Sequence, residues 1–157
     1  ILRCSWFSQN FSENFLRDSV LSGEIVLPTG AIQEPFVDAD DIADVAVAAL
    51  SDERHIGQLY ELTGPRLLTF AEASEEIAKA VGRDIRYVQV SAQEYAAALA
   101  EAGLPSDFQW LVNYLFATVL DGRNAHLADG VQRALGRPPR DFADYAQTTA
   151  ATGIWKV

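Results

Sequence analysis

The stretch Ile1-Leu2-Arg3-Cys4-Ser5-Trp6-Phe7 has the pattern of a β-strand that is already under way at the first residue. No turn or start signal precedes it. The chain contains no methionine, and Ile1 is too large to follow a trimmed initiator methionine. We therefore expect that residue 1 is not the natural start and that part of any functional site lies upstream.

Beyond this strand the chain alternates helices with extended segments. Further extended segments are expected at 24–27, 35–37, 58–62 and 85–90. Such alternation predicts a parallel sheet covered by helices. Only 1–5 and 58–62 have the character of sheet-core strands, and two strands make a poor independent sheet. We expect the rest of a larger sheet to lie outside this chain.

The helices are predicted from apolar spacing and from end signals. Asp38 or Asp40 is expected to cap the second helix, and Thr69 and Ser91 open capping boxes for the next two. The predicted helices cover 8–21, 42–50, 70–81, 92–103, 106–120, 130–135 and the residues from 141 onward.

Length, composition and charge narrow the class of protein. The 157 residues suit one domain with a real core, and 49% hydrophobic residues are ordinary for a soluble protein. The single cysteine cannot form an internal disulfide, and no apolar run approaches the ~18 residues of a membrane span. The net charge of −10 repels phosphate backbones and anionic lipid. We expect a cytoplasmic protein that binds neither nucleic acid nor membrane, with the acidity serving solubility.

Familiar chemical motifs are missing from these residues. Neither a G-x-G-x-x-G turn nor a G-x-x-x-x-G-K-S/T loop occurs, and no Ser-His-Asp set has supporting spacing. His55 and His126 are far apart in sequence and lack a ligand pattern, so no metal site is expected. The aspartates between 38 and 44 are better explained by helix capping than by cation binding.

The best candidate for a site is the segment 5–11, which follows the first strand. Ligands of open α/β sheets bind at the carboxyl ends of parallel strands. Trp6 and Phe7 can stack on a planar ring and Asn10 can hydrogen-bond to it, but these aromatics serve equally well as core, with Asn10 as a helix cap. Cys4 is better read as a small buried hydrophobe than as a nucleophile. Four aromatics of the 106–120 helix suit either a pocket wall or core packing: Phe108, Trp110, Tyr114 and Phe116.

Five stretches, taken in order, resemble the NmrA-like family of atypical short-chain dehydrogenases, which includes NAD(P)H azoreductase-like and triphenylmethane-reductase-like enzymes. They are LRCSWFSQNF at 2–11, GEIVLPTG at 23–30, PFVDADDIADVA at 35–46, YELTGPRLLTFAEA at 60–73 and LGRPPRDF at 135–142.

The resemblance implies an α/β fold that is the C-terminal half of a Rossmann-type doubly wound parallel sheet plus a small α/β substrate-side domain. Residues 1–5 and 58–62 would be the sixth and seventh strands of that sheet. The Rossmann portion would comprise 1–23 and 36–64, and the smaller domain 24–35 and 65–157. The glycine-rich turn that binds the pyrophosphate would lie upstream.

The resemblance also implies site residues. Cys4, Ser5, Trp6 and Phe7 would line the nicotinamide end of NAD or NADP, and Asn10 matches the family's asparagine after that loop. Many relatives have proline at the position of Cys4, so the backbone there would be looser in this chain. The substrate pocket would be shaped by four aromatics: Phe11, Phe108, Trp110 and Tyr114.

The activity implied is NAD(P)H-dependent reduction of a quinone-like, azo or other conjugated small molecule. Two alternatives remain open at this point: a dinucleotide-binding redox sensor without turnover, and a fragment that is inactive alone. The expected partners are the small-molecule substrate and, along the first strand, either the upstream half or another subunit.

Overall fold

The computed structural model describes all 157 residues. Its strands are β1 (Leu2–Cys4), β2 (Glu24–Leu27), β3 (Gln33–Glu34), β4 (Tyr60–Leu62), β5 (Leu68–Thr69) and β6 (Arg86–Gln89). Its α-helices are α1 (Arg17–Ser22), α2 (Ala39–Ser51), α3 (Phe70–Val81), α4 (Ala92–Glu101), α5 (Ser106–Tyr114), α6 (Gly130–Leu135) and α7 (Phe142–Thr152). Shorter turns are η1 (Ser8–Phe11), η2 (Glu53–His55) and the π-helical η3 (Leu115–Val119).

The first strand pairs in parallel with β4, as the sequence predicts. Leu2 is opposite Tyr60 and Cys4 is opposite Leu62, and the Ser5 N–H extends the ladder to the Leu62 carbonyl at 3.0 Å. A parallel bridge between Phe7 and Val37 continues the line beyond the strand. No other strand of the chain pairs with β1 or β4, so each keeps one open edge.

Two further strand pairs lie apart from β1 and β4. The predicted strands β2 and β6 form a parallel pair, and β3 pairs antiparallel with β5. The chain therefore holds three two-stranded sheets rather than one continuous sheet. The α/β class is confirmed, with two small parallel sheets, β1 with β4 and β2 with β6.

The predicted helix at 8–21 is wrong as a single element. The chain makes the 3₁₀ turn η1, then an irregular bend, and only then α1. Side chains in the bend compete with the helical backbone for hydrogen bonds: Asn14 Oδ1 accepts the Phe15 N–H at 2.8 Å. The helix predicted at 106–120 is continuous in outline, but it widens from α5 into the π turn η3.

The predicted caps are confirmed in most cases. Thr69 and Ser91 each form a complete capping box with the glutamate three residues later. Asp38, rather than Asp40, caps α2 by accepting the Asp40 N–H. Helix α6 begins at Gly130, where a Cβ atom would lie only 2.1 Å from the Glu61 carbonyl oxygen. Only glycine permits this close approach of α6 to β4.

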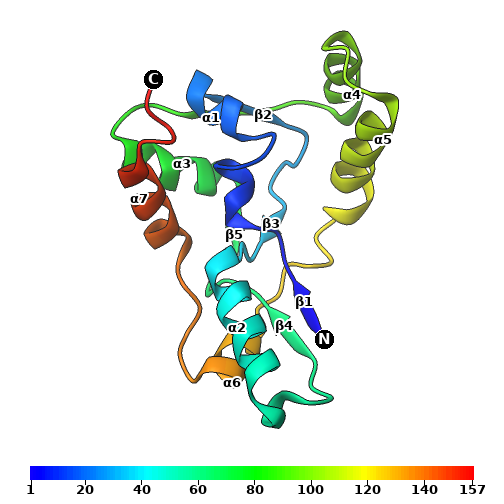
Figure 1. Cartoon of the computed structure of the whole chain (residues 1–157). Coiled ribbons are helices and arrows are strands. Elements are labelled where there is room, and N and C mark those ends of the chain that lie inside the picture. Colours follow the sequence, from blue (N-terminus) through cyan, green and yellow to red (C-terminus); the bar gives the residue numbers. More distant parts are fainter.

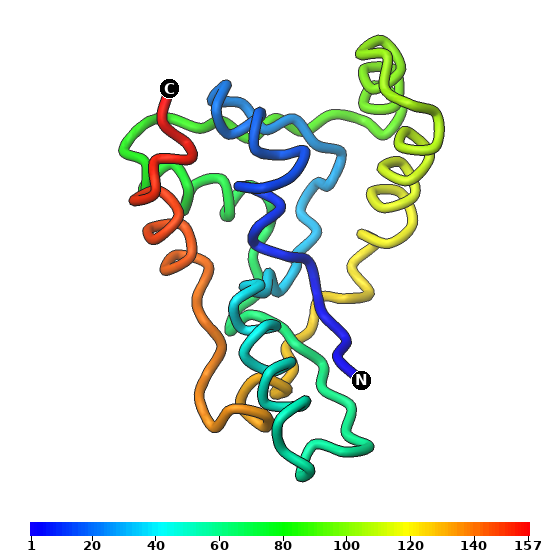
Figure 2. Tube along the Cα trace, viewed as in Figure 1, coloured from blue at the N-terminus to red at the C-terminus, as the bar shows by residue number.

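The interior consists of two hydrophobic cores. The large core holds 18 buried residues and joins η1, α3, α5 and α7 with β2, while the small core holds six under β1 and β4. The small core consists of Val37, Val45, Tyr60, Leu62, Val131 and Ala134. Figure 1 shows α3 beside α7 on one side, α4 and α5 on the other, and β1, β4, α2 and α6 together below. The trace in Figure 2 shows the N-terminal segment running up from the lower part into the upper part.

Helix α6 belongs to the lower group, where it packs on β4 and α2, although the predicted boundaries assign it to the substrate-side domain. None of the helices has the length and apolar character that crossing a bilayer requires.

Candidate functional site

A cavity of about 380 Å³ opens at the carboxyl end of β1. The last residues of β1 and β4 form its floor, and the π turn η3 and the segment after it close over the other side. Its apolar wall is made by Trp6, Leu62, Leu115 and Val119. Its polar lining is made by Arg3, Cys4, Ser5, Glu34, Glu61, Thr63, Asn124 and His126. This position is where open α/β sheets bind ligands.

Trp6 is the largest side chain of the cavity wall. Its indole packs edge-on against Phe70, with 5.8 Å between ring centroids, and against Phe116 at 5.9 Å. The indole Nε1–H is buried and has no hydrogen-bond partner in the chain. The large core therefore fixes the indole ring, whereas the indole N–H lacks a hydrogen-bond acceptor.

Ser5 and Cys4 lie at the centre of the cavity floor. The Ser5 hydroxyl donates to the Pro35 carbonyl at 2.5 Å, which ties the end of β1 to the segment before Val37. Burial raises the pKa of the Cys4 thiol, which keeps it protonated and a poor nucleophile. The sequence predicts a small buried hydrophobe at Cys4, and the structure leaves this residue half-buried at the cavity.

The other two residues predicted to contact the nicotinamide lie outside the cavity. Phe7 is 42% exposed, and Asn10 lies half-buried in η1. The neighbouring Gln9 has a structural role instead. Its amide donates to Asp38 Oδ1 at 2.7 Å and its carbonyl accepts the Ala39 N–H at 2.9 Å. The structure thus brings Cys4, Ser5 and Trp6 together and places Phe7 and Asn10 apart from them.

The aromatics predicted for the substrate pocket do not line this cavity. Phe11 is fully buried in the large core, with its ring against Phe36 and Phe142, because η1 turns it inward. Trp110 and Tyr114 lie on the exposed face of α5, where they stack on each other at 5.4 Å. Phe108 lines a separate groove of about 420 Å³. From this helical stretch, Leu115 and Val119 reach the cavity, because the π turn rotates them toward Trp6.

Glu34 is the functional candidate that the sequence analysis missed. Its side chain is 1% exposed, and its Oε1 has no hydrogen-bond partner in the chain. Burial, reinforced by the negative charge of Asp121, raises the pKa of Glu34 to about 7. An isolated acid beside a proline looks like a surface residue, because its burial comes from pairing with β5 and from η3 overhead. No periodic signal in the sequence could have found it.

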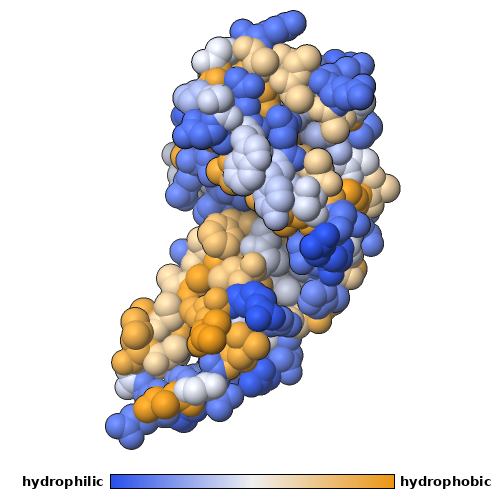
Figure 3. Space-filling model, turned by 90° about the vertical axis from the view of Figure 1, so that its right-hand side faces the viewer, coloured by the Kyte–Doolittle hydropathy of each residue, from blue (hydrophilic) through white to orange (hydrophobic).

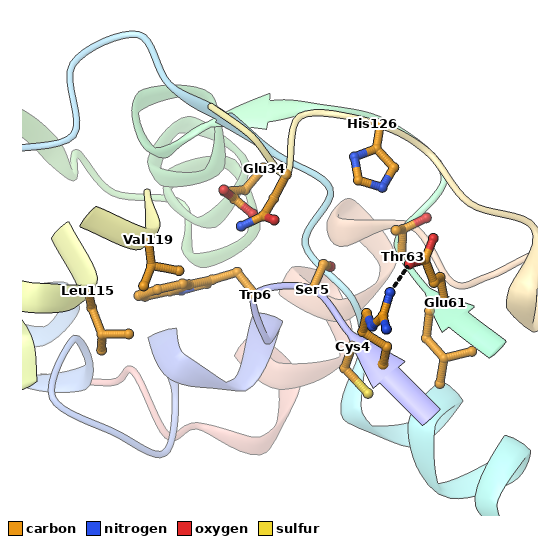
Figure 4. A pocket seen from close by; sticks show the side chains of 12 residues that line it. Cys4, Ser5, Trp6, Glu34, Glu61, Thr63, Leu115, Val119 and His126 are labelled. Atoms are coloured by element: carbon orange, nitrogen blue, oxygen red, sulfur yellow. Dashed lines mark hydrogen bonds and ion pairs between the residues drawn. The ribbon is translucent and has the colours of Figure 1, made fainter. Parts of the chain in front are cut away.

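Figure 4 shows how the cavity divides. Glu34 lies on the side of Trp6, Leu115 and Val119, whereas Glu61, Thr63 and His126 lie on the other. On this second side the Arg3 guanidinium pairs with Glu61 at 2.8 Å. No three His, Cys, Asp or Glu side chains come together in a way that could hold a metal ion.

The sequence of the chain is similar to those of known oxidoreductases over most of its length. No family model matches the chain. An uncharacterised oxidoreductase of Bacillus subtilis is 36% identical over 158 residues, which cover 99% of this chain and 55% of the relative. An NAD(P)H azoreductase of Xenophilus azovorans is 36% identical over 129 residues, covering 82% of this chain and 45% of the relative.

These relatives agree with the resemblance of the chain to the NmrA-like family of atypical short-chain dehydrogenases. Its fold also matches an NADPH-dependent quinone oxidoreductase of Escherichia coli, solved with NADPH, at a TM-score of 0.79 and 23% identity. That match covers 93% of this chain and 51% of the oxidoreductase. The chain thus spans about half the length of the NmrA-like relatives it matches.

Proposed function

We propose that this chain forms the substrate-side half of the site of an NAD(P)H-dependent oxidoreductase that reduces a quinone-like, azo or other conjugated small molecule. The observation that carries the proposal is the cavity at the carboxyl end of β1, walled on one side by the Trp6 indole. The similarity to oxidoreductases over half their length supports it.

The residues of this chain fit one end of the dinucleotide only. They include no glycine-rich turn for the pyrophosphate. At the other end, the half-buried Trp6 offers an aromatic face and an unpartnered N–H, the kind of donor that a carboxamide oxygen satisfies. We therefore assign Cys4, Ser5 and Trp6 to the nicotinamide end, with Phe7 and Asn10 as outer contacts. When bound, the reduced nicotinamide supplies a hydride.

The chain's own side chains prepare the cavity for a flat apolar ligand. Leu62, Leu115 and Val119 exclude water from one side, and Trp6 provides a rigid surface for stacking because Phe70 and Phe116 hold it. A conjugated ring system is the class of molecule that such walls favour, since it gains apolar burial without needing many hydrogen bonds.

The open edge of β1 is the proposed contact for the rest of the sheet. Its backbone groups lack strand partners on that side, and a further strand would satisfy them. Ile1, directly before this strand, is 86% exposed. Figure 3 shows apolar surface gathered over the lower part of the molecule. We propose that a preceding strand of the protein, or a strand of another subunit, covers this edge.

The test is consumption of NADPH by the full-length protein with 1,4-naphthoquinone and an azo dye as acceptors. We expect turnover, and we expect Trp6→Ala to lose at least about tenfold in kcat/KM through the lost stacking surface. Trp110→Ala, an exposed tryptophan outside the cavity, is the matched control and keeps the rate. Residues 1–157 alone are expected to bind no dinucleotide. Dinucleotide binding by the full-length protein without turnover of any acceptor would refute the enzyme and support the redox sensor.

A further inference from the structure

Glu34 stands out among the buried polar groups because it faces a cavity and has no partner in the chain. Antiparallel pairing of β3 with β5 fixes its backbone opposite Leu68. The side chain is almost wholly buried, Oε1 accepts or donates no hydrogen bond, and no ion pair involves it. A buried carboxyl group without a hydrogen-bond partner destabilises the fold unless a ligand forms a hydrogen bond with it.

The charged groups around the cavity do not neutralise Glu34. Arg3 on β1 is occupied by Glu61 on β4. Asp121, just after η3, adds negative charge and is itself paired with Arg123. His126 is exposed on the opposite side of the cavity. With no cation beside it and a negative neighbour, Glu34 keeps its proton up to about pH 7, well above the range in which a carboxyl group ordinarily loses it.

We propose that Glu34 is the proton donor of this site, hydrogen-bonding to and then protonating the oxygen or nitrogen of a reducible carbonyl or azo ligand held against Trp6. The inference rests on the proposed reductase function and adds a catalytic residue to it. Trp6 lines the same cavity, and its buried Nε1–H likewise has no hydrogen-bond partner in the chain.

The proposed step is balanced. When a hydride adds to one atom of the ligand's double bond, the π-electron pair moves to the oxygen or nitrogen at the other end. The Glu34 carboxyl O–H bond breaks, a new O–H or N–H bond forms on the ligand, and Glu34 is left as a carboxylate. The hydride comes from the reduced nicotinamide of the proposed reaction, which is thereby oxidised. Solvent returns a proton to Glu34 through the polar side of the cavity.

The pKa of Glu34, raised to about 7 by burial, suits this role. General acids work best when their pKa lies near the working pH, because enough of the group is protonated and the proton still leaves readily. A carboxyl group at its ordinary pKa would be ionised at neutral pH and could only accept hydrogen bonds.

The experiment compares Glu34→Gln with Glu61→Gln in the full-length protein. Both variants remove one carboxyl group from the same cavity, but Glu61 is partly exposed and paired with Arg3. With 1,4-naphthoquinone we expect Glu34→Gln to lower kcat about 100-fold with little change in KM, since glutamine keeps a donor but cannot give up a proton. The decline of wild-type kcat above pH about 7 should vanish in Glu34→Gln and persist in Glu61→Gln.

A second measurement needs no turnover. Binding of 1,4-naphthoquinone to wild type should weaken several-fold between about pH 6 and about pH 8.5, as Glu34 loses its proton, and the C=O stretch of a protonated carboxyl should disappear in parallel. Binding that is independent of pH, or that is tighter at high pH for the cation N-methylquinolinium than for the quinone, would overturn the proposal. Turnover by Glu34→Gln at the wild-type rate would also overturn it while leaving the reductase function intact. Absence of turnover in wild type would instead refute the function itself.

Discussion

The two cores of this chain differ in composition and in how completely the chain covers them. The large core is rich in aromatic rings, with Phe11 and Phe36 in contact with each other and each also in contact with Phe70 and Phe142. The small core is mainly aliphatic, and its two-stranded sheet keeps open edges. One region is closed by the chain's own helices, whereas the other presents surface for further strands. The cavity lies where they meet, with Trp6 contributed by the margin of the large core and Leu62 by the small one.

This junction also explains why Glu34 is buried. Its strand leads directly to Phe36 of the large core and Val37 of the small core, and both are buried. The backbone there has little freedom, and Gly64 adds a close contact, since a Cβ on it would lie 2.1 Å from the Phe36 carbonyl oxygen. The position of Glu34 is therefore fixed by both cores.

The largest expected effect is on the large core. Phe11→Ala should lower the free energy of unfolding by about 3–5 kcal/mol, because it removes a fully buried ring from a cluster that can collapse only partly. Urea unfolding followed by circular dichroism measures it. Trp110→Ala, 65% exposed, is the control, and we expect about 1 kcal/mol or less. Equal losses in the two variants would contradict the assignment of Phe11 to the core.

The second-largest expected effect is on the pH dependence of stability and concerns Glu34, which lies where the two cores meet. The folded protein holds the proton of Glu34 up to about pH 7, whereas the ordinary pKa in the unfolded chain is 4.5. The unfolded state therefore binds fewer protons across this range, and stability falls as the pH rises through it. Relative to Glu34→Gln, wild type should lose up to about 3 kcal/mol between about pH 4.5 and about pH 7. Urea unfolding over a pH series tests this. A difference that stays constant with pH would show that the carboxyl is not held protonated.

The smallest effect concerns the start of α2, the helix that contributes Val45 to the small core. Asp41, fully buried at the start of α2, accepts the Arg140 N–H at 2.7 Å and pairs with the guanidinium groups of Arg137 and Arg140. Asp41→Asn should cost about 2 kcal/mol, because it weakens these charge-assisted bonds while both arginines still reach solvent. Thermal unfolding is a suitable measurement. Asp40→Asn, in the same first turn but exposed, is the matched control and should change stability little.

The sequence by itself determined most of the local elements and the family resemblance. The capping boxes at Thr69 and Ser91 and the short α6 follow from patterns that act within a few residues. The parallel pairing of β1 with β4 was predicted from the alternation of strands and helices and from the family resemblance. The order of the NmrA-like motifs likewise needs no coordinates. The sequence also predicted a site at the carboxyl end of β1, where the structure has a cavity, because the direction of the chain fixes which end of a strand is its carboxyl end.

Only the tertiary structure decided which side chains meet at that position. Phe11 and Trp110 are both aromatic residues in helical stretches, yet one is buried and the other exposed. The π turn that brings Leu115 and Val119 to Trp6 has no periodic signature, and Glu34 becomes a buried acid only when β5 and η3 close around it. Burial is a sum over contacts between segments distant in sequence, so local patterns cannot supply it.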